Sequence, residues 1–320
     1  MTRSRFSYLM ILEVILCFVL LGAQFFFPDT FSSMLAFPFE QIGAVLRAMS
    51  LSGSTGNIMA IILFLLVVSL PFVAFVRTTN KRDLFAEDYI LLFLGFFTCF
   101  LLYCMINPGL FPELFSAGIR TGKTLLGACF YSTLFGYWIL RFLRHAFLAE
   151  KKDIYHYLVR LLQCLILIFL FVIFGQKSNE LISSYIDVFA KAEEAVGNLT
   201  FTSVFLLFGY LVTSAPYAMT ILISWHSIDL LGMLTQNPNG EITKQKTDHL
   251  VYICSFSLLI TVISIILYNC LQLLFTPALM VINSSLEFPL LPIAFVLVIL
   301  LLIQYIRENQ HLKEDNDLFI

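Results

Sequence analysis

One acidic residue, Glu13, lies inside an apolar stretch long enough to cross a membrane. An ionisable side chain in a bilayer is costly, so it is expected to face protein or water and to serve a function, for example as a proton carrier. At helical spacing Glu13 shares a stripe with Cys17 and Gln24. A second interpretation stays open, because a residue near the cytoplasmic end of its helix can reach the interface or bond to a neighbour.

Hydroxyl-bearing side chains recur at helical spacing on two later apolar segments. They are Tyr210, Thr213, Tyr217, Thr220 and Ser224 on one segment, and Ser257, Thr261, Ser264 and Tyr268, followed by Gln272, on the next. Two such faces can bond helices together, at roughly 0.6 kcal/mol per bond, or line a path or pocket. The predicted intramembrane polar site is Glu13, Tyr210, Tyr217, Thr261 and Tyr268, with interhelical bonding as the alternative.

The sequence signatures of common catalytic sites are missing. The chain contains no GxSxG, GxxxxGK[ST] or HExxH motif. Its seven cysteines include no CxxC pair, and no two of its five histidines have a spacing typical of metal ligands on one helical face. We therefore expect a non-enzymatic protein with no catalytic residues, no bound metal and no cofactor.

The elements that must position these side chains are membrane helices. With 59% hydrophobic and 12% charged residues, the chain is too apolar for a soluble globular surface. A helix needs about 20 apolar residues to cross the hydrocarbon layer, and it pairs its own backbone groups there. Eight stretches qualify, at residues 7–27, 57–76, 89–106, 124–143, 157–176, 201–224, 250–272 and 287–305. The predicted fold class is an all-α polytopic membrane protein, with the lipid bilayer as its first partner.

The basic residues predict the orientation of these spans. Fourteen of the 19 Lys and Arg fall in the amino terminus, in alternate loops and in the carboxyl tail. Basic loops are retained in the cytoplasm, so both termini are expected to be cytoplasmic, in the cytoplasmic membrane of a bacterium. No basic patch interleaved with aromatics indicates direct binding of nucleic acid.

Two halves of the chain follow the same plan. Residues 312–318 (LKEDNDL) resemble residues 148–154 (LAEKKDI), and each copy directly follows the last of four apolar segments. Pro71 in the second span is matched by Pro216 in the sixth. We therefore predict two parallel four-helix repeats, residues 1–156 and 157–320. Chance similarity between hydrophobic segments is the alternative.

Two segments on the predicted outer side are amphipathic, residues 34–49 and 179–196. Each can lie on the membrane surface. Each can instead cover the helix bundle, or form a receptor surface for an extracellular peptide.

The start of the third span and the tail of the second half resemble a known family. Gly240-Glu241-Ile242-Thr243 leads into a span, and residues 312–320 (LKEDNDLFI) close the chain. In these features residues 201–320 resemble the bacterial membrane family catalogued as domain of unknown function 2975; the first half carries only the looser residues 84–88 (LFAED). A typical member of that family is a single four-helix unit. The resemblance implies a gene neighbourhood that includes a small helix-turn-helix regulator.

The sequence thus predicts a sensor, a sequestering partner or an immunity-type protein acting with such a regulator. The residues expected to dock the regulator on the cytoplasmic side are Arg82, Arg144, Lys151, Lys244, Arg307 and Lys313. One alternative is a transporter of small solutes or peptides with a midplane site between the repeats and Glu13 as proton carrier. Another is a purely structural subunit of a larger complex, which the sequence does not separate from the first interpretation.

Overall fold

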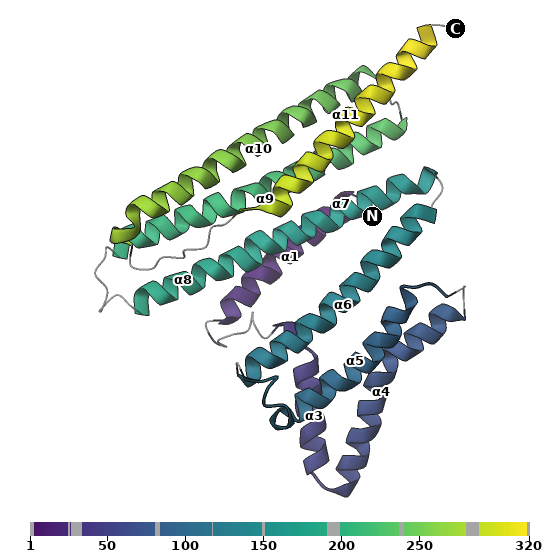
Figure 1. Cartoon of the computed structure of the whole chain (residues 1–320), viewed down its shortest axis with the longest axis vertical. Coiled ribbons are helices and arrows are strands. Elements are labelled where there is room, and N and C mark those ends of the chain that lie inside the picture. The colour runs from purple at the N-terminus through teal and green to yellow at the C-terminus, as the bar shows by residue number, and fades with distance from the viewer. Residues whose placement is uncertain are drawn as a thin grey trace. The chain divides into compact units, whose positions relative to one another are not determined.

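The computed structural model describes residues 3–24, 26, 34–80, 84–116, 118–148, 151–190, 199–236, 240–279 and 288–318. The regular secondary structure in these ranges is helical, and they contain no β-strand (Figure 1). Within them, eight helical segments are long and apolar enough to cross a membrane. Each overlaps one of the eight predicted spans, which confirms the predicted fold class, an all-α polytopic membrane protein.

The chain divides into two compact units. Unit 1 comprises residues 1–22 and 151–320, and unit 2 comprises residues 23–150. This division differs from the predicted domains, residues 1–156 and 157–320, mainly in the first helix, which packs with the second half of the chain. The duplication itself stays a prediction.

Unit 2 is built from four α-helices and two 3-10 turns in its described part. They are η1 (Met34–Ala36), α3 (Phe39–Leu51), α4 (Ser54–Thr79), α5 (Asp88–Ile106), η2 (Pro108–Leu110) and α6 (Ile119–Leu148). The turn from α3 to α4 passes through Gly53 at φ 124°, a conformation that favours glycine. Leu101 and Leu102 of α5, with no exposed surface, lie in the centre of the core.

The amphipathic segment at residues 34–49 is packed into unit 2. Helix α3 contacts α4 and α5, and it buries Phe39, Gly43 and Leu46. Arg47 donates a hydrogen bond of 2.9 Å to the carbonyl of Ile106 at the end of α5, where the helix leaves carbonyls unpaired. Lys123 of α6 pairs with Glu40 at 2.9 Å. These contacts match the expectation of a helix that covers the bundle.

Unit 1 contains the longest helices. Its elements are α1 (Arg3–Gln24), α7 (Lys151–Phe171), the π-helix η3 (Val172–Lys177), α8 (Ser178–Ala190), α9 (Leu199–Gln236), α10 (Glu241–Phe275), η4 (Thr276–Ala278) and α11 (Leu290–Leu318). The elements α7, η3 and α8 follow one another without a break, as Figure 1 shows for α7 and α8. At about 1.5 Å per residue this rod is roughly 60 Å long, about twice the hydrocarbon thickness. Residues 179–190 of the second amphipathic segment therefore continue the fifth span; residues 191–196 lie outside the described residues.

Helix α9 lies at the centre of unit 1 and uses opposite faces for different neighbours. One face carries Ile223 and Leu230, which pack with residues of α10 and α11. The other face meets α7 and α1: the Tyr217 ring lies 5.9 Å from that of Phe169, and the Trp225 ring lies 6.2 Å from that of Phe6. These contacts fix which α9 side chains point towards which helix.

Candidate functional site

Glu13 lies in the middle of helix α1. It is the eleventh residue counted from Arg3 in a helix of 22 residues. A helix of that length just crosses the hydrocarbon layer, so its middle residue lies about half-way through. This position does not suit the interpretation that Glu13 reaches the interface from the end of its helix.

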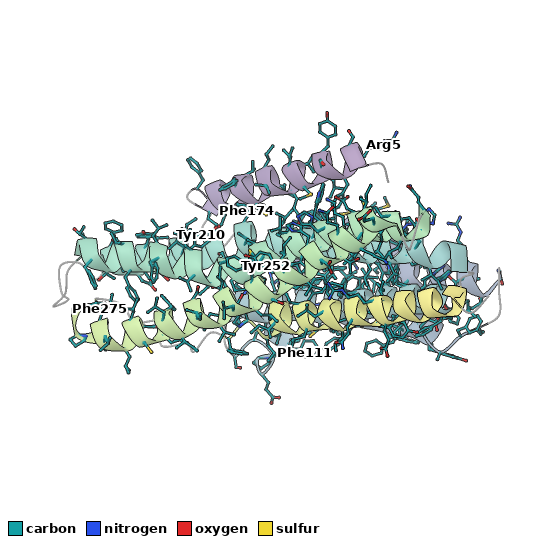
Figure 2. The ribbon with its side chains drawn as sticks, turned by 90° about the horizontal axis from the view of Figure 1, so that it is seen from above. Arg5, Phe111, Phe174, Tyr210, Tyr252 and Phe275 are labelled. Carbon is teal, nitrogen blue, oxygen red and sulfur yellow. The ribbon has the colours of Figure 1, made fainter. Side chains whose placement is uncertain are left out.

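The stripe of α1 that includes Glu13 faces the groove between α7 and α9. Phe6, Cys17 and Leu21, at multiples of three and four residues, are buried. At one end of the stripe Phe6 stacks on Trp225 of α9; further along, Phe18 lies 5.9 Å from Phe174 of η3, which Figure 2 draws beside α1. Between these contacts, Oε2 of Glu13 is buried and has no hydrogen-bond partner among the described residues.

A second buried oxygen without a partner belongs to Ser214 of α9. Its side chain is 7% exposed, and Oγ has no hydrogen-bond partner within the described part of the chain. Ser214 lies seven residues before Ile221 and eleven before Trp225, so it shares their face of α9. Ile221 and Trp225 pack with α1 and α7. Glu13 and Ser214 therefore lie on helix faces that pack into the same α1/α7/α9 interface.

The π-helix η3 borders this interface. Ser178, directly after it, donates a hydrogen bond of 3.1 Å to the Ile173 carbonyl and lies 3.3 Å from the Tyr210 hydroxyl. Gly175 inside the π-helix is buried. π-Helical turns inside α-helices are often found at functional sites. Here the turn places hydroxyl groups beside the face of α9 that carries Ser214.

The five residues of the predicted polar site separate into groups. Tyr210 and Tyr217 point towards η3 and α7, the side of α9 that also faces α1. Tyr268 lies on α10, 5.5 Å from the Phe205 ring, on the other side of α9, and Thr261 is buried on α10. The structure thus groups Tyr210 and Tyr217 with the helices that pack around Glu13, and it places Thr261 and Tyr268 elsewhere.

Several hydroxyls of the first predicted stripe, on α9, bond within their own helix. Thr220 donates to the Pro216 carbonyl at 2.7 Å, and Ser224 donates to the Thr220 carbonyl at 2.8 Å. Such bonds to the preceding turn pair the hydroxyl without linking helices. The Thr220 bond also reaches the turn in which Pro216 lacks its amide donor. These two residues therefore neither join α9 to a neighbour by a hydrogen bond nor leave a hydroxyl free.

The predicted docking residues that the structure describes lie at the ends of both units that are predicted to face the cytoplasm, which we call the inner ends. Arg144 of α6 is ion-paired with Glu87 and lies 3.7 Å from the centre of the Phe85 ring. Arg307 of α11 is ion-paired with Asp248 of α10. Lys244 is half-buried near the start of α10.

The remaining docking candidates are placed less fully. The structure places Lys151 at the start of α7 and Lys313 in the last turns of α11. Arg82 lies outside the described residues.

Two histidines meet at the inner end of unit 1. The rings of His226 on α9 and His249 on α10 lie edge to face with centroids 5.7 Å apart. Among the residues that the structure describes, no three His, Cys, Asp or Glu side chains are grouped so as to hold a metal ion. The pair marks the polar end of the α9/α10 contact.

Sequence reasoning missed Ser214, Ser178, Glu87 and Asp248. A single serine in an apolar helix gives no signal beyond its position on a face. Glu87 and Asp248 could have been found from the sequence. Consecutive spans run antiparallel, so an acidic residue near the start of one helix is expected beside an arginine near the end of the next.

Comparison with protein-family models, with curated proteins and with solved structures finds no match for this chain. The resemblance to the family catalogued as domain of unknown function 2975 therefore stays a prediction. The structure shows that the chain is a multi-pass all-α membrane protein.

Proposed function

We propose that this protein is a non-enzymatic bacterial membrane protein that binds a small helix-turn-helix regulator at its cytoplasmic side. The observation that carries the proposal is the polar inner end of unit 1. There α9, α10 and α11 continue as helices beyond their apolar parts and present His226, His249, Asp248 and Arg307. Charges of both signs on helical ends suit the docking of a small protein.

The continuous rod made of α7, η3 and α8 connects the inner end of unit 1 to its predicted outer side. One end of the rod starts at Lys151 and the other end, α8, packs against α9, where Tyr185 donates a hydrogen bond of 2.8 Å to the Ser203 carbonyl. A peptide that binds α8 and shifts it moves a continuous helix whose far end lies at the inner end. In the proposal this movement changes the affinity for the regulator.

The decisive measurement compares two charge reversals. Arg307→Glu alters the inner end, whereas Arg120→Glu alters the start of α6 at the opposite, predicted outer end of unit 2. After mild solubilisation of native membranes, the regulator is quantified against the membrane protein by mass spectrometry. We expect recovery to fall at least tenfold for Arg307→Glu, about 1.4 kcal/mol or more, and to stay unchanged for Arg120→Glu. Equal recovery from both variants would contradict the proposal.

Transport is the second candidate, and the buried oxygen of Glu13 favours it. An intramembrane carboxyl can couple solute movement to a proton gradient. Uptake by proteoliposomes under an imposed pH gradient separates the two functions. Loss of a proton-dependent flux in Glu13→Gln would establish transport, and absence of any flux in the wild type would eliminate it.

A further inference from the structure

Two buried polar atoms without partners are rare enough in one helix interface to require an explanation. A buried hydroxyl or carboxyl that makes no hydrogen bond loses its solvation without compensation. Glu13 Oε2 and Ser214 Oγ are both such atoms, on helices α1 and α9. The α1/α7/α9 interface also contains the apolar cluster of Phe6, Ile166 and Leu170.

The register of the three helices brings the two residues to similar depths. Trp225 of α9 is level with Phe6, and Phe174 of η3 is level with Phe18. Helix α9 passes α7 in the opposite direction, with Tyr217 beside Phe169 and Tyr210 beside Ser178. Ser214 lies between those two contacts, and Glu13 lies between Phe6 and Phe18. The two side chains are therefore about one helical turn apart along the membrane normal.

The chemistry of the site favours a proton as its ligand. A lone carboxylate in an apolar layer is so costly that the group takes up a proton or a cation. Sodium sites in membrane proteins draw on several oxygens, often carbonyls of unwound helices. In the described part of this interface, one carboxyl and one hydroxyl are the side-chain groups that lack a partner. One proton on the carboxyl, with one bridging water, satisfies both.

We propose that Glu13 and Ser214 form a proton-binding site inside unit 1. Hydronium gives its proton to Glu13 Oε2 and leaves as water, and a new O–H bond forms on the carboxyl. The carboxylic acid then donates a hydrogen bond to a bridging water, and that water donates one to Ser214 Oγ. This inference holds whether the protein binds a regulator or moves a solute.

A lipid-soluble carbodiimide tests the site, because it modifies protonated carboxyl groups within membranes. The full-length protein in its native membrane is treated with dicyclohexylcarbodiimide at about pH 5 to about pH 9, a range that includes the titration of carboxyl groups stabilised in the neutral form. Peptide mass spectrometry then locates the adducts. We expect a pH-dependent adduct on Glu13 and none on Glu87, whose carboxylate is paired with Arg144. Absence of the Glu13 adduct, or an extent that does not fall as pH rises, would overturn the proposal.

Ser214 has a matched control on the same helix. Ser224 is also buried, but its hydroxyl already donates to the Thr220 carbonyl. At the pH of half-modification in the wild type, we expect Ser214→Ala to lower the modification of Glu13 about threefold to tenfold, because the neutral acid loses its hydrogen-bond partner. Ser224→Ala should keep the wild-type profile.

Two further outcomes would count against the assignment. If Ser214→Ala followed the wild-type pH profile, the pairing of the two residues would be wrong. If sodium chloride protected Glu13 and choline chloride did not, the site would bind sodium instead of a proton.

Discussion

Each unit has an ion pair between an acidic residue and an arginine at its inner end. The pair of unit 2 is buried, and the pair of unit 1 is exposed. In each, an acidic residue at or near the start of one helix pairs with an arginine near the end of the apolar part of the next. Glu87 pairs with Arg144 in unit 2, and Asp248 pairs with Arg307 in unit 1. The side chains of the first pair are 10% and 17% exposed, and those of the second are 70% and 43% exposed.

This difference separates a structural ion pair from one that a partner can reach. The buried pair is reinforced by the Phe85 ring, which the Arg144 guanidinium covers. The exposed pair is screened by water and ions, so it contributes little to stability and leaves both groups open to competition by another charged surface. The comparison therefore assigns a stabilising ion pair to unit 2 and an accessible ion pair to unit 1, at the end where we propose that the regulator docks.

The largest expected effect is the removal of the buried carboxylate. Glu87→Ala leaves Arg144 buried without its counter-charge, and such losses cost about 3–5 kcal/mol. Reversible unfolding in mixed micelles measures the difference. The double variant Glu87→Leu/Arg144→Met removes both charges and should recover most of the loss. A single variant as stable as the wild type would remove the basis of the comparison.

A smaller loss of stability is expected from Gly→Ala substitutions at tightly packed positions, which compare the packing of unit 2 with that of unit 1. A Cβ at Gly127 of α6 would collide with the backbone carbonyl of Leu35, whereas one at Gly209 of α9 meets the flexible Tyr268 phenol. We expect Gly127→Ala to cost about 1–3 kcal/mol and Gly209→Ala to cost less, because a side chain can shift and a backbone cannot.

Gly136 provides the control for that pair. It lies on the same helix as Gly127, and a Cβ there meets no described heavy atom within 4 Å. The free energy of unfolding of Gly136→Ala should therefore equal that of the wild type or slightly exceed it, since alanine is the better helix former. Equal losses at positions 127 and 136 would show that the close approach to Leu35 is not the cause.

The smallest expected effect on stability is at the exposed pair. Arg307→Ala removes an ion pair whose partners are largely solvated, so the free energy of unfolding should change by about 0.2–1 kcal/mol. The same micelle measurement, repeated in about 1 M salt, should make the difference disappear. If Arg307→Ala lowered the free energy of unfolding as much as Glu87→Ala, the two ion pairs would contribute equally to stability.

The spans could be predicted from sequence because each depends on a local property, the length of an apolar run. The partners of each span could not. Helical spacing places Tyr210 and Tyr217 on one face of α9, but it does not say that this face meets α7 and η3 while α10 lies on the other side. For that reason the predicted site combined residues that the structure separates.

The sequence pattern also did not predict that the helix of the fifth span continues into α8. The apolar run gives way to Gln176, Lys177 and Ser178, which reads as the end of a span. In the structure these residues continue the helix, because Lys177 and Gln176 both bond to Glu180 and Ser178 bonds to the Ile173 carbonyl. Polar residues there stabilise a helical turn instead of ending it.

The grouping of α1 with the second half has a consequence for biosynthesis. This helix is synthesised before the rest of unit 1, because α7 and α9, which it packs against, are translated more than a hundred residues later. At roughly 5–20 residues per second, Glu13 waits on the order of ten seconds or more in lipid or in the insertion machinery before its groove exists. A nascent chain arrested after Leu148 therefore exposes an unpacked carboxyl-bearing helix, which membrane quality-control proteases are suited to recognise.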